Sequence, residues 1–281
     1  MWSSESVRKI MLGHHAQGST ALQLMALVAG CALAAPVHGA QSIAFDKPSR
    51  EQRVALPADP DNPQAKAELR CFSYPFVMIK QADRGEVGAE LAIVPRTPEK
   101  PEAACEIKPA EGQLGVPDAL QGVGEPGYLK GKLGDYLIFS AAEGWQGAEG
   151  FWVYSQDGNK LFADLGMPES LKLALLPAGN ATPSGQALTL RYQRVYQAQC
   201  SLFADAQGCW QDISQRTGLS GKAPDCRPAY QRLLAELPAG KKQAGKATPS
   251  LIGYQVEVII DRTSVSHMTP VSGATHCWTP E

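Results

Sequence analysis

Apolar and polar residues alternate along two long segments in the second half of the chain. In residues 187–200, apolar side chains fall on one face, and threonine, arginine and glutamine on the other. Only Arg194 and Val195 break this alternation. Residues 251–261 carry isoleucine, tyrosine or valine at every second position. Alternation over this length is typical of a strand that buries one face, so we predict two such strands.

The centre of the chain combines continuous apolar runs with turn signals. Residues 136–139 are apolar on both faces, which is typical of a strand buried on both sides. Residues 151–155 and 160–166 are further strand-like runs, and Asp157 and Gly158 lie between them. An Asp-Gly pair in this position favours a hairpin with a type I′ turn, in which both residues have positive φ. We therefore predict an antiparallel meander here.

The part of the chain before this meander is predicted to contain a hairpin. Residues 41–67 form a leading segment with a proline-rich loop. Residues 67–83 are rich in β-branched and aromatic side chains. Pro75 marks a bulge, an edge or a break in this strand, because proline cannot donate a ladder hydrogen bond. A glycine-containing turn separates this segment from residues 88–95, so the two are predicted to pair.

Between the two alternating strands the periodicity becomes helical. A first short helix is predicted to end at Gly218, since glycine is the usual C-terminal cap. A second can be capped by Asp225, and one apolar face follows, formed by Tyr230, Leu233, Leu234 and Leu237. The predicted fold is therefore mainly β, an antiparallel sheet or sandwich, with a small disulfide-stapled helical hairpin near residues 209–237.

The N-terminus has the pattern of an export signal. Arg8 and Lys9 precede an apolar run over 21–37, which small residues follow. This order predicts a signal peptide over 1–40 and a single β-rich secreted domain over 41–281. A spanning helix needs roughly 20 apolar residues, so no transmembrane helix is predicted.

A second interpretation of the same region gives a lipid anchor. Residues 28–31 resemble a bacterial lipoprotein box, in which Cys31 would be lipidated. The segment after Cys31 stays apolar, however, whereas a lipidated cysteine is normally followed by a polar tether. We therefore expect a periplasmic or secreted protein, with anchoring at Cys31 as the alternative.

The cysteines after residue 40 are even in number: Cys71, Cys105, Cys200, Cys209, Cys226 and Cys277. An even count in an oxidising compartment favours three disulfides. Cys209 and Cys226 begin successive predicted helices, so we predict that they are paired. Because the strands that flank the helices are expected to be neighbours, Cys200 is predicted to pair with Cys277. The remaining pair, Cys71–Cys105, would close the first hairpin region.

No metal site and no nucleophilic cysteine are predicted. Structural zinc sites use close C-x2-C pairs and histidines at helical spacing. Neither occurs here, and the predicted secreted domain has only His267 and His276. His276 is adjacent to Cys277, and adjacent residues on a strand point to opposite faces. Disulfide bonding is therefore the favoured interpretation of Cys277.

Charge and motifs narrow the classes of function. The formal net charge is −2 at pH 7, and no basic stripe is visible, so nucleic-acid binding is not expected. The chain lacks a G-x-S-x-G nucleophile elbow, a phosphate-binding G-x-x-x-x-G-K-[ST] loop and a G-x-G-x-x-G fingerprint after a strand. We therefore predict no cofactor and assign no catalytic residue.

The candidate ligand-binding residues are aromatic and lie in the central meander: Trp145, Trp152 and Tyr154. Trp152 and Tyr154 share one face of a strand, which is either core or a surface that could stack on a sugar or a partner protein. Trp145 is the best exposed candidate, because it lies in a glycine-flanked turn.

Acidic side chains surround the same meander: Asp135, Glu143, Glu149, Asp157 and Asp164. A glycosidase needs two carboxyl groups roughly 5–10 Å apart. The main hypothesis is a non-catalytic exported protein with a binding, envelope or inhibitor role and a protein or glycan partner in the cell envelope. The alternative is an exported hydrolase that acts on glycans or peptidoglycan through these carboxylates. The oligomeric state stays open.

Overall fold

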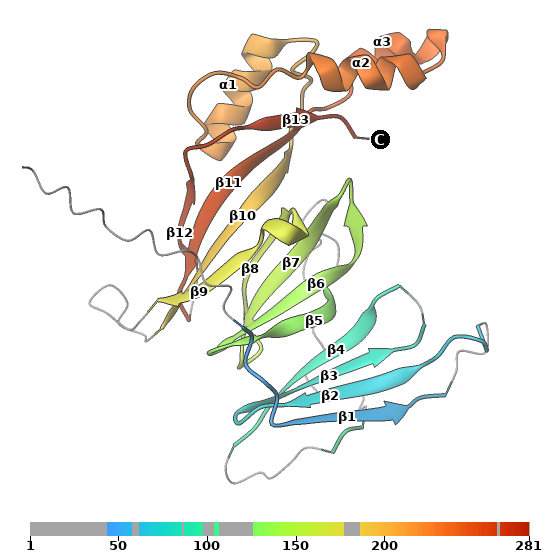
Figure 1. Ribbon diagram of the computed structural model, residues 1–281, viewed down its shortest axis with the longest axis vertical. Coiled ribbons are helices and arrows are strands. Elements are labelled where there is room, and N and C mark those ends of the chain that lie inside the picture. Colours follow the sequence, from blue (N-terminus) through green and yellow to red (C-terminus); the bar gives the residue numbers. More distant parts are fainter. Residues whose placement is uncertain are drawn as a thin grey trace, which may run out of the picture. The chain divides into compact units, whose positions relative to one another are not determined.

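The computed structural model describes residues 44–57, 62–85, 87–97, 104–106, 126–176, 186–262 and 265–280. Ser42–Glu281 form one compact unit. Its strands form a four-stranded and a nine-stranded sheet, accompanied by short helices (Figure 1). The predicted β-rich fold class is therefore confirmed. The predicted signal peptide, with Cys31, lies outside the described residues.

The four-stranded sheet has the order β1-β2-β3-β4 and is antiparallel throughout. Its strands are β1 (Arg50–Ala55), β2 (Glu68–Ser73), β3 (Val77–Asp83) and β4 (Ala89–Pro95). Pro75 breaks the predicted strand of residues 67–83 into β2 and β3, and β4 completes the expected pairing. The sequence did not indicate β1, because five of its six residues are exposed and it has no alternating pattern.

The nine-stranded sheet has the order β12-β11-β10-β8-β7-β6-β5, and in addition β9 pairs with β10 and β13 with β11. The predicted meander consists of β5 (Pro126–Leu133), β6 (Tyr136–Trp145), β7 (Ala148–Ser155) and β8 (Lys160–Gly166). The other strands are β9 (Lys172–Leu176), β10 (Ala187–Gln197), β11 (Leu251–Ile260), β12 (Val265–Pro270) and β13 (His276–Trp278). β10 and β11, the two strands predicted from alternation, are direct antiparallel neighbours.

The tight turns of the meander differ from the prediction. The hairpin at Asp157 and Gly158 forms, but only Gly158 has positive φ, 88°, so the turn is not of type I′. The type I′ geometry occurs instead at Gln146 and Gly147, whose φ values are 53° and 77°. A turn was predicted here from the flanking glycines, but not its type, because a glutamine with positive φ is uncommon.

The first hydrophobic core fills one face of the nine-stranded sheet and combines residues of the meander with residues of β10 and β11. Tyr136 of β6 links the two halves. Its hydroxyl group donates to the carbonyl oxygens of Gln186, at 2.8 Å, and Ile260, at 3.2 Å. The sheet is therefore bent so that its two halves share one core.

The second hydrophobic core lies between the two sheets. It includes Ile79 and Ile93 from the four-stranded sheet and Phe139 from β6. A buried polar contact supports it, because the Leu129 N–H of β5 donates to Gln81 Oε1 of β3 at 3.0 Å. The nine-stranded sheet is thus covered on both faces, which explains the apolar run at residues 136–139.

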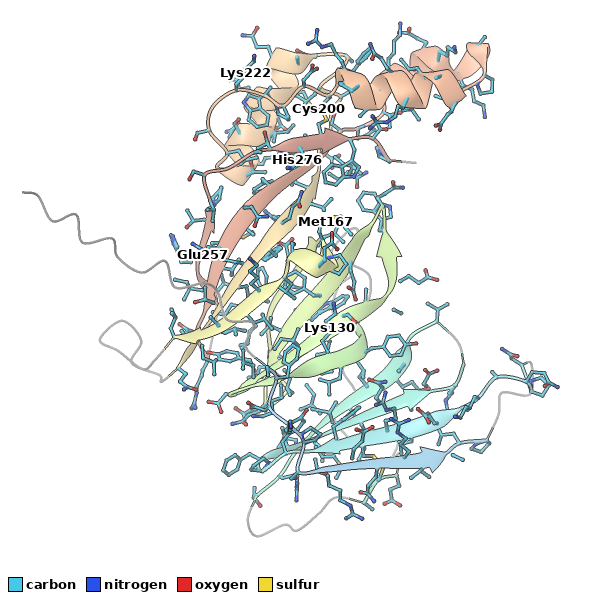
Figure 2. All side chains as sticks on the ribbon, in the orientation of Figure 1. Lys130, Met167, Cys200, Lys222, Glu257 and His276 are labelled. Atoms are coloured by element: carbon cyan, nitrogen blue, oxygen red, sulfur yellow. A yellow bond between two sulfur atoms is a disulfide. The ribbon has the colours of Figure 1, made fainter. Side chains whose placement is uncertain are left out.

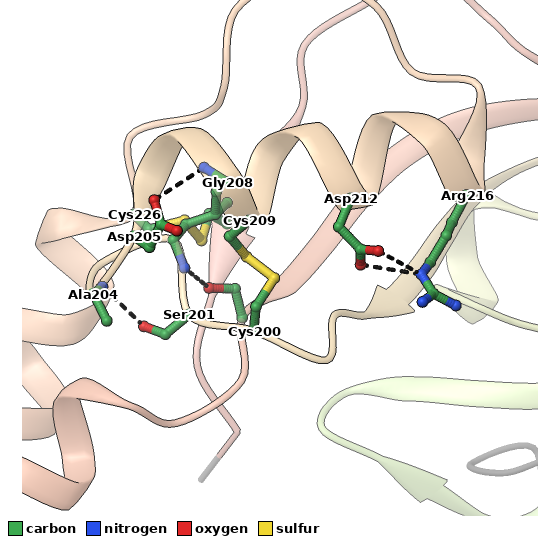
Figure 3. The surroundings of a disulfide bond; sticks show 12 residues. Cys200, Ser201, Ala204, Asp205, Gly208, Cys209, Asp212, Arg216 and Cys226 are labelled. Atoms are coloured by element: carbon green, nitrogen blue, oxygen red, sulfur yellow. Dashed lines mark hydrogen bonds and ion pairs between the residues drawn. A yellow bond between two sulfur atoms is a disulfide. The ribbon is translucent and has the colours of Figure 1, made fainter.

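Three helices follow β10: α1 (Ala206–Thr217), α2 (Arg227–Glu236) and α3 (Lys242–Lys246). Two 3-10 turns, η1 (Pro168–Ser170) and η2 (Ala239–Lys241), complete the elements. The Asp205 carboxylate caps α1 by accepting the Gly208 N–H at 2.9 Å (Figure 3). Gly218 ends α1 with φ 74°, as predicted.

All the cysteines after residue 40 form disulfides, but two of the predicted pairings are wrong. The bonds are Cys71–Cys105, Cys200–Cys209 and Cys226–Cys277. The first was predicted, whereas the other two replace Cys209–Cys226 and Cys200–Cys277. The helical hairpin is therefore not closed on itself, because Cys200–Cys209 ties α1 to the chain after β10 and Cys226–Cys277 ties the start of α2 to β13. Three disulfides are typical of an oxidising, extracellular compartment.

Local geometry explains the observed pairing. β10 ends at Gln197, and the chain turns at once into α1, so Cys200 reaches the first turn of the helix (Figure 3). The Cα atoms of Cys200 and Cys209 are 5.6 Å apart. Cys277 lies opposite Ile252 in the β13–β11 ladder, and β13 contacts α2, which begins after Cys226. Within the described ranges, no helix has the length and apolar character to cross a membrane.

Candidate functional site

Two of the three candidate aromatic residues lie in the second core. Trp152 and Tyr154 are only 2% and 3% exposed. The Tyr154 ring packs edge-on against Phe139, with 5.6 Å between the ring centroids. The two residues share a face, as expected, but that face is covered by the four-stranded sheet. A ligand on the protein surface therefore does not reach either ring.

Trp145 has a different environment. It is the last residue of β6, next to the type I′ turn, and it packs half-buried at the margin of the second core. The tip of this hairpin lies beside Met167, since a β-carbon placed on Gly147 would be 3.9 Å from Met167 Cε. Trp145 is thus held by a short turn and is partly open to solvent.

A hollow adjoins Met167. Its volume is about 200 Å³ with open solvent included, and it is lined by Lys130, Glu149, Phe151, Gly166, Met167, Pro168, Leu171 and Tyr192. Lys130 and Met167 are labelled in Figure 2. Gly166 is required here, because a β-carbon at this position would be 2.7 Å from Tyr192 Cδ2. The missing side chain lets the Tyr192 ring lie against β8 and form part of the wall.

Two of the residues that line the hollow, Lys130 and Glu149, form an ion pair. Lys130 Nζ lies 2.9 Å from Glu149 Oε2, and the two side chains are 29% and 22% exposed. They come from β5 and β7, on either side of β6, whose pairing with β7 shifts register between Ser140 and Gly144. Such irregularities redirect side chains and are frequent next to functional sites. The pair offers both hydrogen-bond donors and acceptors to a ligand.

Tyr192 connects the hollow with a buried acid, Asp164, which is 6% exposed. The Tyr192 hydroxyl group donates to the Asp164 carboxylate. Arg194 Nε lies 2.8 Å from Asp164 Oδ2, and Arg194 also donates to the hydroxyl oxygen of Tyr254 at 3.0 Å. Arg194 breaks the alternation of β10 because its side chain compensates this buried carboxylate.

The cluster shifts the pKa values of its members. Burial raises the pKa of Asp164 above its ordinary value, while Arg194 and the Tyr192 hydroxyl group oppose that shift. Burial, followed by the charge of Asp164, raises the pKa of Tyr192. Tyr192 therefore remains a protonated donor at neutral pH, and the Asp164 carboxylate is held in place by two donors.

The acidic residues around the meander separate into several environments. Asp135 forms an ion pair with Arg262, and Glu143 and Asp157 are exposed. The other two, Glu149 and Asp164, share a face of the sheet.

Glu149 and Asp164 are diagonal neighbours on β7 and β8. The register pairs Glu149 with Gly166 and Phe151 with Asp164. Diagonal neighbours in an antiparallel ladder are roughly 7–8 Å apart. A separation of this size falls in the range of a carboxylate pair. Among the described residues, no group of three or more His, Cys, Asp or Glu side chains could hold a metal ion.

Comparisons with protein-family models, with curated proteins and with solved structures found no match. Function is therefore inferred from the geometry of the chain itself.

Sequence reasoning missed Lys130 and the roles of Arg194 and Tyr192. Two signals were visible in the sequence: Asp164 interrupts the apolar run of β8, and Arg194 interrupts the alternation of β10. A charged side chain at a core position of a strand is stable only when an opposite charge lies nearby. Asp164 and Arg194 together therefore predict an internal ion pair. Lys130 carried no comparable signal.

Proposed function

We propose that the chain is an exported, non-catalytic binding protein of the cell envelope, periplasmic or secreted, which holds a glycan at the tip of the β6–β7 hairpin. The observation that carries this proposal is the half-buried position of Trp145 at the tip of the β6–β7 hairpin, whose opposite face carries the hollow and its Lys130–Glu149 ion pair. An aromatic face binds the apolar face of a sugar ring, and charged side chains bind its hydroxyl groups.

The size of the hollow favours recognition of part of a larger ligand. Pockets that enclose a drug-sized ligand have volumes of roughly 300–1,000 Å³. The hollow has about 200 Å³ with open solvent included. Because that volume is mostly open solvent, the hollow would contact only a small protruding group of a glycan, and the rest of a polymer would stay in solvent.

The state of the carboxylates supports binding without catalysis. Glu149 is engaged by Lys130, and Asp164 is engaged by Arg194 and Tyr192. A general base or nucleophile needs a lone pair that is free to reach the substrate. Both acids instead bind cations or donors of the protein.

Titration calorimetry with soluble peptidoglycan fragments and with chito-oligosaccharides tests this proposal. We expect saturable binding that becomes roughly tenfold weaker in Trp145→Ala, a loss of about 1.4 kcal/mol. Phe76→Ala is the matched control, because Phe76 is an aromatic residue that is 58% exposed in the β2–β3 turn. Unchanged affinity in Trp145→Ala, or binding only to envelope proteins in a parallel pull-down, would contradict glycan binding at this tip.

The second candidate function is the exported hydrolase, and the diagonal arrangement of Glu149 and Asp164 favours it. A carboxyl group with a raised pKa can act as a general acid. Release of reducing ends from peptidoglycan would be measured for the wild type, Glu149→Gln and Asp164→Asn. Turnover that both substitutions abolish would establish the hydrolase, whereas binding without turnover supports the main proposal.

Localisation is tested separately by mass spectrometry of the mature protein. A soluble exported protein should begin near residues 35–41. A diacylated Cys31 at the N-terminus would instead establish the lipid anchor.

A further inference from the structure

β1 is an edge strand with a free hydrogen-bonding side. The Leu56 N–H donates to the Ala67 carbonyl oxygen at 3.0 Å, which makes these residues a hydrogen-bonded pair of the β1–β2 ladder. Bonded pairs alternate along an antiparallel ladder, so the even-numbered residues of β1 bond to β2. The N–H and C=O groups of Glu51, Arg53 and Ala55 therefore point away from the sheet.

Nothing in the described part of the chain pairs with this outer side. The strand contains no proline, and its register with β2 runs without a shift from Arg50↔Ser73 to Ala55↔Glu68. Proteins usually protect such edges with prolines, bulges or charges, because a regular free edge is a template for another strand. Of these protective devices β1 has only charged side chains. Their order along the strand determines which partner strand it can pair with.

We propose that β1 pairs antiparallel with β1 of a second copy of the chain, about a two-fold axis at Gln52. In this register each of the two charged residues whose backbone groups point outward meets a partner of opposite charge. Glu51 lies opposite Arg53 of the partner subunit, and Arg53 opposite Glu51 of the partner subunit. The four-stranded sheet becomes one continuous eight-stranded sheet across the two copies, and the interface is self-complementary, as a two-fold axis requires.

The charges select this register over its neighbours. An axis at Glu51 would place two carboxylates opposite each other, and an axis at Arg53 would do the same with two guanidinium groups. An axis at Arg50 would oppose two Arg50 side chains and use only one end of the strand. Like charges directly opposite each other destabilise a sheet, and opposite charges stabilise it. Of these axes, only the one at Gln52 combines charge complementarity with pairing over Arg50–Val54, five of the six residues of β1.

Contacts within the subunit already hold the Glu51 side chain in position for this pairing. Glu51 Oε1 accepts from Arg70 at 2.9 Å and from Arg53 at 3.1 Å. The hydrogen bond from Arg70 contributes most to lowering the pKa of Glu51. The carboxylate is therefore ionised under ordinary conditions, and Arg70 orients it on the face where Arg53 of the partner subunit would arrive.

Sedimentation equilibrium of the mature domain over roughly 1–300 µM tests the proposal. We expect a monomer–dimer equilibrium that weakens at least about tenfold in Glu51→Arg and in Arg53→Glu. The double variant Glu51→Arg/Arg53→Glu should restore it, because the opposite charges face each other again. Glu257→Arg, which breaks the exposed Arg191–Glu257 pair on β10 and β11, is the matched control and should dimerise like the wild type.

A backbone variant separates edge pairing from side-chain effects. Arg53→Pro removes an N–H that points outward and leaves the bonds to β2 in place, so the variant should remain folded and be monomeric. A wild type that stays monomeric over the whole concentration range would overturn the proposal. So would a dimer that persists in Arg53→Pro or that the double variant fails to restore.

Discussion

The guanidinium group of Arg194 lies 2.8 Å from the carboxylate of Asp164 at the point where β8 meets β10. β10 pairs with β9 along Ala187–Arg191 and with β8 only at Arg194. The nine-stranded sheet changes direction here, and the ion pair occupies the bend. Because both groups are largely buried, each is tolerated only in the presence of the other.

Removing one member of this pair should strongly destabilise the domain. We expect Arg194→Met to lower the free energy of unfolding by about 3–5 kcal/mol, because the Asp164 carboxylate is left buried without compensation. The double variant Arg194→Met/Asp164→Leu should cost less than the single change. Urea denaturation measures both, and Arg191→Met on the exposed face should stay within about 0.5 kcal/mol of the wild type. Equal losses in the single and double variants would contradict the coupling.

The disulfides should differ in their contribution to stability. Cys226–Cys277 closes a separation of 51 residues and Cys200–Cys209 one of 9. The chain-entropy relation gives about 4 and about 2.6 kcal/mol for loops of these sizes. Thermal unfolding of Cys226→Ser/Cys277→Ser and of Cys200→Ser/Cys209→Ser should therefore show the larger loss for the first pair. Peptide mapping without reduction checks the pairing, and a Cys209–Cys226 peptide would contradict it.

Gly166→Ala should destabilise the domain and reshape the hollow. The added methyl group would be 2.7 Å from Tyr192 Cδ2, so the ring or β8 must move. Overpacking of this kind costs about 1–3 kcal/mol. Denaturation measures the loss, and the Gly240→Ala variant is the control, because nothing lies within 4 Å of a β-carbon there. A Gly166→Ala variant as stable as the control would show that Tyr192 moves freely.

Gln146→Asn should stabilise the β6–β7 hairpin. Gln146 has φ 53° in a type I′ turn, and asparagine tolerates this conformation better than glutamine. We expect a gain of about 0.5–1 kcal/mol in the free energy of unfolding. The same change at Gln231, on the exposed face of α2, should give no gain, since asparagine is the poorer helix former. A gain at both positions would point to a cause other than the turn.

The strands with clear alternation were predictable, and the edge strand was not. β10 and β11 each bury one face against the first core, so their sequences alternate over ten or more residues. β1 buries neither face and is held in place by its hydrogen bonds to β2. Such backbone bonds produce no pattern of apolar and polar residues. The turn at the tip of the β6–β7 hairpin was predicted, but its type was not, because Gln146 adopts a conformation that its residue type rarely shows.

The candidate site was only partly predictable. Trp145 was identified by its glycine-flanked turn, whereas Trp152 and Tyr154 were placed on a shared face without knowledge of what covers it. That cover is the four-stranded sheet, which comes from a distant part of the chain. Lys130 and Glu149 are separated by 19 residues and meet across β6 only because the β6–β7 register shifts.

The sequence by itself determined the class of fold, the course of the central meander, the end of α1 at Gly218 and the involvement of every described cysteine in a disulfide. These properties depend on local preferences and on an even count of cysteines. Only the tertiary structure decided which cysteines are partners, which aromatic face is buried and which charges meet at Asp164. The physical reason is that these contacts form when a bent sheet closes on itself and is covered by a second sheet. The positions they bring together are set by packing between layers, and no pattern within one strand or helix encodes that packing.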